Sequence, residues 1–478
     1  MIGILSRRPS SLLILGGMAI MLGMAGGASA GPIEELGAWL KSDRTTRPDL
    51  EAQAFANTPL SAAECALAKT MIWTERTAYV KSAYGAQWTA KRLVNKDDFQ
   101  MPFDYRIYGS KPAQGYDLYI SMHGGGETDA ATNDQQWRNQ ITLYHPAGIY
   151  LAPRAPTDAW NMWHKDHIDG FFDQIIQSAV ALQGANPNRV YIMGYSAGGD
   201  GVYQMAPRMA DRWAAAAMMA GYPNHASPIN LRDIGFTMHV GALDSSYGRN
   251  TMAVTYGNMI KKLQDADPGF YQYDVKVHPG KPHWMDQEDT VALSWIDLFT
   301  RNPYPRKVVW HQDTTVGTNS FPSDPIRPVK GAPTQYQFYW VALQERNPQA
   351  KPALITAEIK GQEVDIVDAN VDSLFVLLND SLIDLDRPVA VYWKGNKIFS
   401  ALAPRTLANL YRSVQDRGDR DYAFPVRLKL ARTDSMASIS PRLQDKRRAK
   451  GMGRADVLRS GDGHYSDLRG RSLPPAPP

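Results

Sequence analysis

The chain has 478 residues, of which 44% are hydrophobic and 21% are charged, which is an ordinary composition for a globular protein with a large core. The net charge is +4, but residues 1–30 contain two arginines and no acids, and residues 441–478 contain nine basic and four acidic residues, so the remaining body carries −3. The net charge of the body therefore does not favour nucleic-acid binding. The length predicts two or three domains.

Residues 1–30 have the three-part layout of a secretory signal peptide. Arg7 and Arg8 precede an apolar run at 12–25, and the small residues 28–30 predict cleavage after Ala30. The run is shorter than the roughly 20 apolar residues that a membrane span requires, so we expect no stable membrane insertion after cleavage. The two arginines are a weak sign of twin-arginine export. The expected location is the periplasm or the medium.

Cys65 is the only cysteine, so no intramolecular disulfide can form. Export without disulfides is more typical of a large bacterial protein than of a small disulfide-stabilised domain. We expect a buried thiol on a helix.

The elements expected along the chain form two successive patterns. Residues 31–100 read as a helical segment, in which Ser61 and Glu64 have the spacing of a capping box. Strands and helices then alternate through 101–305, which predicts a mostly parallel sheet with helices on both faces. The expected strands are 101–109, 116–122, 147–152, 189–194, 212–221, 236–242 and 271–277, and the expected helices are 169–183, 201–210, 250–266 and 285–300.

The C-terminal part has a different texture. Residues 306–335 are rich in proline and predict a linker. Residues 336–435 predict a mainly β accessory domain with hairpins at 361–362 and 395–396 and one helix near 405–415. The last residues, 436–478, lack apolar periodicity and predict a disordered basic tail.

The stretch "GYSAG", 194–198, places Ser196 in a G-x-S-x-G pattern between an expected strand and an expected helix. A sharp strand-to-helix turn holds a nucleophile in a strained conformation, and the glycines avoid clashes there. The helix N-terminus behind the serine favours developing negative charge.

A second glycine-rich stretch, "HGGG" at 123–126, follows the expected strand 116–122. Such a loop offers backbone N–H groups to a carbonyl oxygen that becomes an oxyanion. The candidate oxyanion-hole residues are Gly124, Gly125 and Ala197.

A serine needs a base, and the base needs an orienting acid. In this architecture the order along the chain is serine, acid, histidine. Asp244 follows the strand 236–242 and is the candidate acid, with Asp200 as its nearest rival. His283 lies in the loop after the last strand and is favoured as the base over His278, which sits at the end of that strand.

The loop 153–169 follows a strand end and is expected on the rim of the site. Its Trp160 and Trp163 either stack on substrate or wedge the loop against the core. Together with Tyr195 and Trp284 they are the candidate substrate-binding residues. In the same loop, His164 and His167 suggest a metal pair, but no third ligand of suitable spacing completes it, so no metal is predicted.

The motifs "HGGG", "GYSAGG", "GALDSSYG" and "HPGKPHW" together resemble the α/β-hydrolase superfamily. Within it they are most similar to secreted esterases related to feruloyl esterases and polyhydroxybutyrate depolymerases, and to prolyl-oligopeptidase-type peptidase domains. The resemblance covers about 101–300 and implies a Ser196–His283–Asp244 triad and no cofactor. In lipases the residue after HGGG is usually apolar. Here it is Glu127, which weakens the hypothesis of a long-chain lipid substrate.

The sequence thus predicts an exported serine hydrolase that cleaves a small or polymeric carboxylic ester through an acyl-enzyme. A serine peptidase is the alternative, because esters and amides use the same triad. A polymer-binding protein that works through its β domain is a third reading.

Overall fold

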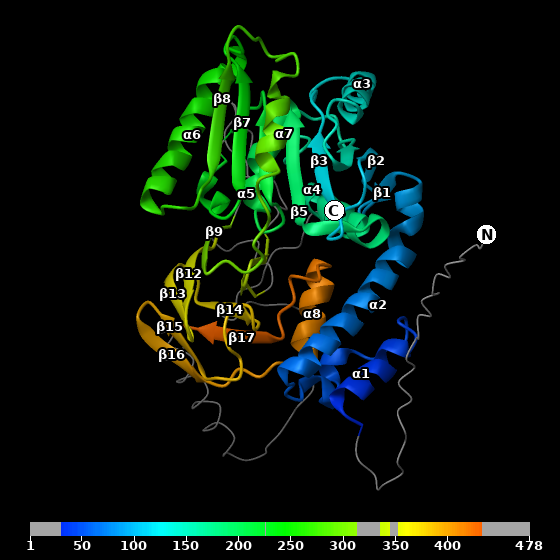
Figure 1. Cartoon of the computed structure of the whole chain (residues 1–478), viewed down its shortest axis with the longest axis vertical. Coiled ribbons are helices and arrows are strands. Elements are labelled where there is room, and N and C mark those ends of the chain that lie inside the picture. Colours follow the sequence, from blue (N-terminus) through cyan, green and yellow to red (C-terminus); the bar gives the residue numbers. More distant parts are fainter. Residues whose placement is uncertain (1–29, 225, 313–334, 345–351, 433–478) are drawn as a thin grey trace, which may run out of the picture.

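The computed structural model describes residues 30–224, 226–312, 335–344 and 352–432 (Figure 1). The predicted signal peptide up to residue 29, the segment 313–334 of the predicted linker, and the tail from 433 onward lie outside the described residues.

A central sheet of eight strands has the order β1-β2-β4-β3-β5-β6-β7-β8. β2 is antiparallel to β1 and β4, whereas β4, β3, β5, β6, β7 and β8 are parallel to one another. This is the mostly parallel sheet that the alternating pattern predicts. The strands are β1 (Arg92–Val94), β2 (Gln100–Tyr108), β3 (Tyr116–Met122), β4 (Gly148–Pro153), β5 (Ala185–Tyr195), β6 (Ala215–Met219), β7 (Gly235–Gly241) and β8 (Tyr273–His278).

Helices cover both faces of this sheet. This explains why the sequence of β5 is continuously apolar. Val190 and Ile192 pack in the core beneath α4, α5 and α6, whereas Tyr191 and Met193 point to the opposite face, where α7 packs. A strand buried on both faces needs apolar residues at every position. The helices around the sheet are α3 (Ala130–Ile141), α4 (His167–Ser178), α5 (Ala197–Arg208), α6 (Arg249–Ala266) and α7 (Val291–Ile296). Of the helix predicted over 285–300, only α7 and a short 3-10 turn form, because Asp286 and Gln287 adopt left-handed backbone conformations.

The C-terminal unit contains two further sheets and one helix, α8 (Leu407–Arg417). One sheet has the order β16-β15-β13-β12-β9 and the other β10-β11-β14-β17. Both predicted hairpins are present: Lys360 pairs with Glu363 across a turn in which Gly361 has φ 58°, and Trp393 pairs with Asn396 across Lys394-Gly395. The strands are β9 (Lys307–His311), β10 (Gln337–Phe338), β11 (Val341–Ala342), β12 (Leu354–Lys360), β13 (Glu363–Ala369), β14 (Ser373–Leu378), β15 (Val389–Trp393), β16 (Asn396–Ala401) and β17 (Val426–Ala431).

The predicted linker begins with a strand, which corrects its boundary. β9 pairs with β12 along its whole length and buries Val308 and Trp310 on one side. The strand is short and lies between prolines, so its alternating pattern is not apparent in the sequence. The C-terminal unit therefore begins at about residue 307.

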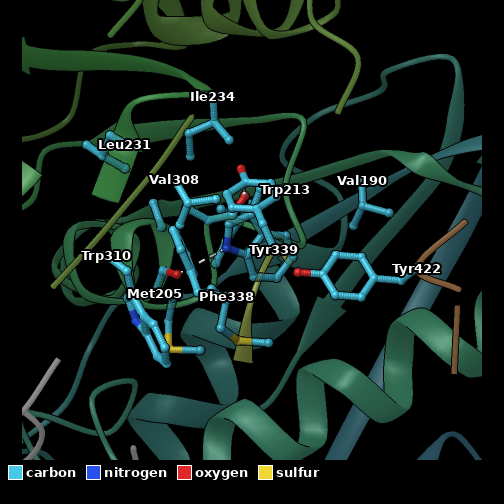
Figure 2. Packing of buried hydrophobic residues seen from close by; sticks show 14 of the residues in the cluster. Val190, Met205, Trp213, Leu231, Ile234, Val308, Trp310, Phe338, Tyr339 and Tyr422 are labelled. Atoms are coloured by element: carbon cyan, nitrogen blue, oxygen red, sulfur yellow. Dashed lines mark hydrogen bonds between the residues drawn. The ribbon is translucent and has the colours of Figure 1, made fainter. Parts of the chain in front are cut away.

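The first unit, built on the eight-stranded sheet and called the α/β unit below, and the second, C-terminal unit share one hydrophobic core, shown in Figure 2. Trp213, at the base of the large sheet, is completely buried and lies close to side chains of the C-terminal unit. The labelled residues of this packing are Val190, Met205, Trp213, Leu231 and Ile234 from the first unit and Val308, Trp310, Phe338, Tyr339 and Tyr422 from the second. Buried ion pairs add to the contact: Arg301 bonds to Asp419 at 2.6 Å.

The N-terminal segment consists of α1 (Pro32–Lys41), two 3-10 turns and the long helix α2 (Ala62–Thr89), which Figure 1 shows running beside both units. Ser61 and Glu64 form the predicted capping box, and Cys65 is a buried thiol whose pKa burial raises to about 11. The Arg76 guanidinium donates to Gln415 of α8 and Gln177 of α4, so α2 joins the two units. None of the helices that the structure describes has both the length and the apolar character needed to cross a bilayer.

Candidate active site

Four loops meet at the carboxyl edge of the parallel strands. They follow β3, β5, β7 and β8 and carry, respectively, the HGGG stretch, Ser196, Asp244 and His283. Parallel strands place their carboxyl ends at one edge of a sheet, which is where open α/β sheets build their sites. Residues up to 160 positions apart in sequence are thereby brought to one place.

Ser196 occupies the tight turn between β5 and α5, with φ 58° and ψ −121°. This is a strained conformation for a residue with a side chain. The flanking glycines are required sterically: a Cβ at Gly194 would lie 2.3 Å from the carbonyl oxygen of Gly198, and a Cβ at Gly198 would lie 2.1 Å from that of Met122. The turn therefore depends on both glycines of the G-x-S-x-G pattern.

The side chains of Ser196, His283 and Asp244 form a continuous hydrogen-bonded chain. His283 Nε2 lies 2.9 Å from Ser196 Oγ, and its Nδ1 lies 2.7 Å from Asp244 Oδ2. Because a carboxylate only accepts, Nδ1–H donates to Asp244 and Nε2 is left to accept from the serine hydroxyl. Asp244 is buried, while the His283 side chain is 41% exposed and faces the opening of the site.

The two rival residues point elsewhere. Asp200 accepts the Tyr222 N–H at 2.6 Å, and burial raises its pKa to about 6. His278 lies beneath the site, with Nε2 3.1 Å from His239 Nδ1. The structure thus brings the favoured acid and the favoured base to the serine.

The candidate oxyanion-hole residues lie against Ser196. A Cβ on Gly124 would be 3.1 Å from Ser196 Cβ, so a larger residue here would press on the nucleophile. Ala197 is the first residue of α5, and the first N–H groups of a helix have no partner within it. Asn133 of α3 fixes the loop from behind, since its Oδ1 accepts the Gly126 N–H at 2.8 Å. This asparagine belongs to no motif, and no pattern in the sequence points to it.

His123 and Trp163 support the same loop from below. His123 Nε2 accepts the Ala155 N–H, so its Nδ1–H donates to the Gly124 carbonyl at 2.6 Å, and burial lowers the His123 pKa to about 3. Trp163, a candidate for substrate binding, is fully buried and donates its indole N–H to the His123 carbonyl at 3.0 Å. That prediction is corrected: Trp163 wedges the loop against the core, because its ring fills the space beside Gly201 and His123.

The other three candidate substrate-binding residues border open space. Trp160 and Trp284 line cavities beside Ser196, and Trp284 is 44% exposed. Tyr195 lines the same cavity as Trp284 but is itself buried. Its hydroxyl donates to the His283 carbonyl at 2.7 Å and accepts the Met285 N–H at 3.0 Å, so it also fastens the loop that carries His283.

Two cavities meet at Ser196. The larger, about 620 Å³, is bordered by His283, Trp284, Tyr195 and Leu143, and the smaller, about 210 Å³, by Trp160, Asp200, Tyr222, Tyr247 and Arg249. Gly125 borders both. The serine hydroxyl therefore lies between a wide site on the histidine side and a small site on the other, whose lining mixes aromatic and charged side chains.

No cluster of three or more histidine, cysteine or acidic side chains suited to a metal ion occurs in the described parts of the chain. His164 is buried, with its pKa lowered to about 3 by burial, and His167 stacks on Phe99.

No protein-family model matches the sequence, and no curated protein is significantly similar to it. Among solved structures, a thermostable esterase shares 19% identity over 44% of this chain, with a TM-score of 0.35. The match spans 62% of that esterase, less than two thirds of its length. A mutant of the feruloyl esterase module from Clostridium thermocellum, complexed with sinapinate, shares 16% identity over 44% of this chain and 86% of its own, with a TM-score of 0.33.

At these identities and TM-scores the matches carry no argument. The structural class is therefore assigned from the architecture of the molecule. A mostly parallel sheet with helices on both faces, and a strained serine between β5 and α5, define an α/β-hydrolase fold. The chain joins this fold to a C-terminal β unit and an N-terminal helical segment.

Proposed function

We propose that this protein is an exported serine hydrolase that cleaves a carboxylic ester through an acyl-enzyme on Ser196. The observation that carries the proposal is the hydrogen-bonded chain from Ser196 through His283 to the buried Asp244, at 2.9 and 2.7 Å. This geometry supplies a nucleophile, a base and an orienting acid in one site.

In the proposed reaction, Ser196 Oγ attacks the ester carbonyl while His283 Nε2 takes its proton. The N–H groups of Gly124, Gly125 and Ala197 stabilise the oxyanion, and Asp244 stabilises the imidazolium. His283 then returns the proton to the leaving alcohol as the carbon–oxygen bond breaks. Water, activated by the same histidine, attacks the acyl-enzyme and releases the acid.

The two cavities suggest how the substrate lies. The group that protonates the leaving alcohol must reach its oxygen, and His283 borders the 620 Å³ cavity. We therefore place the alcohol in that cavity, beside Trp284 and Tyr195. The acyl group then occupies the 210 Å³ cavity, which is small compared with ordinary ligand pockets and suits a short acyl chain.

The test is a panel of p-nitrophenyl esters and p-nitroanilides on purified wild type and Ser196→Ala, with fluorophosphonate labelling of both. We expect ester hydrolysis and labelling by wild type, and a loss of at least about 10⁴-fold in kcat in the folded variant. Hydrolysis of the anilides alone would mean that the protein is a peptidase and not an esterase. Labelling that persists in Ser196→Ala would contradict the nucleophile.

Export is proposed from the signal-like segment 1–30, which lies almost entirely outside the described residues. Expression of the full gene with fractionation, followed by N-terminal sequencing of the exported product, tests it. Cleavage after Ala30 is expected, and retention of residues 1–30 on a cytoplasmic product would contradict it.

A further inference from the structure

Arg249 introduces a positive charge into the small cavity next to the nucleophile. Its side chain is 12% exposed and borders this cavity together with Ser196. Its Nε is buried and has no hydrogen-bond partner. What bears on a ligand is the position of the side chain, since an arginine on the wall of a cavity beside the nucleophile offers charged N–H donors to an anion bound in that cavity.

The backbone places this arginine there against local preference. Arg249 is the first residue of α6, where the partial positive charge of a helix N-terminus disfavours a cation. The two residues before it, Tyr247 and Gly248, both have left-handed backbone conformations, with φ 56° and 67°. The Arg249 guanidinium carbon lies 4.9 Å from the centre of the Tyr247 ring, which steadies it. Strain and unfavourable charge at one turn are typical of a functional position.

Three carboxyl groups lie near the cavity, and Asp244 is the one that forms an ion pair with Arg249. The nearest oxygen, Asp244 Oδ1, is 3.7 Å from Nη1, beyond a hydrogen bond, and the other oxygen of Asp244 is occupied by His283. Asp200 is turned to the Tyr222 N–H, and Glu127 lies exposed on the rim. Burial raises the pKa of Asp200 to about 6, and the positive charge of Arg249 acts on it in the opposite direction.

We infer that the small cavity binds a carboxylate on the acyl group of the substrate, with Arg249 as the residue that recognises it. The inference rests on the proposed ester hydrolysis and names its substrate class: monoesters of short dicarboxylic acids, whose free carboxylate accepts from the Arg249 guanidinium. Hydrolysis of such an ester releases the alcohol through the larger cavity and the dicarboxylic acid from the smaller one.

The experiment compares two esters of equal chain length, p-nitrophenyl hydrogen glutarate and p-nitrophenyl pentanoate, after subtraction of their uncatalysed rates. For wild type we expect kcat/KM of the glutarate ester to exceed that of the pentanoate by about 10- to 100-fold, the effect of a charge-assisted hydrogen bond. In Arg249→Gln this ratio should fall to about one, and Arg249→Lys should restore part of it. The ratio is decisive, because a purely structural role next to Asp244 would slow both esters equally.

Trp284→Ala is the matched control, since it alters the larger cavity and should change the two esters alike. A wild type that cleaves pentanoate through Ser196 without preferring glutarate keeps the proposed function and overturns this inference. A glutarate preference that survives Arg249→Gln also overturns it. Failure to cleave either ester would contradict the proposed function itself, and the inference would fall with it.

Discussion

Two histidines near the nucleophile have different surroundings, and each surrounding determines what the side chain can do. His283 stands between Ser196 and Asp244 and is partly open to solvent. His278 is buried, lies 3.1 Å from His239, and sits 3.4 Å from a carboxylate oxygen of Glu288. Only the first can exchange a proton with a substrate.

We expect His283→Ala to lower kcat by about 10⁴-fold or more, because the serine loses its base. His278→Ala should lower kcat less than about tenfold and act mainly on thermal stability. Steady-state kinetics with melting curves of both variants provide the measurement. Equal losses in two well-folded variants would mean that the base assignment is wrong.

Asp200 gives a residue-scale prediction about pH. Burial raises its pKa from 3.8 to about 6, so the folded state binds a proton that the unfolded state has already released between these values. The ionised carboxylate therefore lowers stability as pH rises through this window, and the penalty is complete above about pH 6.

Asp200→Asn removes that penalty while keeping an acceptor for the Tyr222 N–H. We expect the variant to be about 1–3 kcal/mol more stable than wild type at pH 7.5 and to gain nothing at pH 4. Denaturant titrations at the two pH values measure this. A gain of equal size at both would show that the charge of Asp200 is irrelevant.

At the scale of elements, the turn from β5 into α5 allows no added side chain at Gly198. A Cβ there would meet a backbone oxygen at 2.1 Å, and a backbone atom cannot rotate away. Gly198→Ala should therefore displace α5 from β3 and reduce both kcat and melting temperature strongly. Gly170→Ala on α4 is the control, because its Cβ would meet nothing within 4 Å and alanine favours the helix by about 1 kcal/mol. Normal activity and stability in Gly198→Ala would refute the steric argument.

Sequence reasoning succeeded where chemistry is local. The capping box at Ser61, the two hairpin turns and the glycines around Ser196 are each dictated by neighbouring residues, and all are present. The motif order also placed Asp244 and His283 in the loops that meet Ser196, although their catalytic roles stay predictions.

The errors and omissions share a different cause. β9 becomes a strand through its pairing with β12, and Trp163 is buried through its bond to His123. Asn133 and Arg249 enter the site from helices whose position only the folded chain defines. Contacts between distant segments leave no periodic trace in a single sequence.

For the whole molecule, the shared core predicts that the α/β unit and the C-terminal β unit unfold together. Trp213 is fully buried in this core (Figure 2), so Trp213→Ala should cost about 3–5 kcal/mol and shift a single transition. Trp284→Ala, at an exposed position, should leave the melting temperature nearly unchanged. Differential scanning calorimetry with both variants is the measurement, and two separate transitions in wild type would contradict a common core.

The packing of the N-terminal segment against α8 has a consequence for biosynthesis. Leu36, Ala68 and Ile72 are buried against Leu407 and Leu410, more than 330 residues later in the chain. A growing polypeptide cannot bury this first segment until most of the chain has been made, since its partner α8 emerges late. Completion of the fold is therefore delayed to a late stage of synthesis. This delay is compatible with the export that we propose, since transport of an unfolded chain requires that the fold is not yet complete.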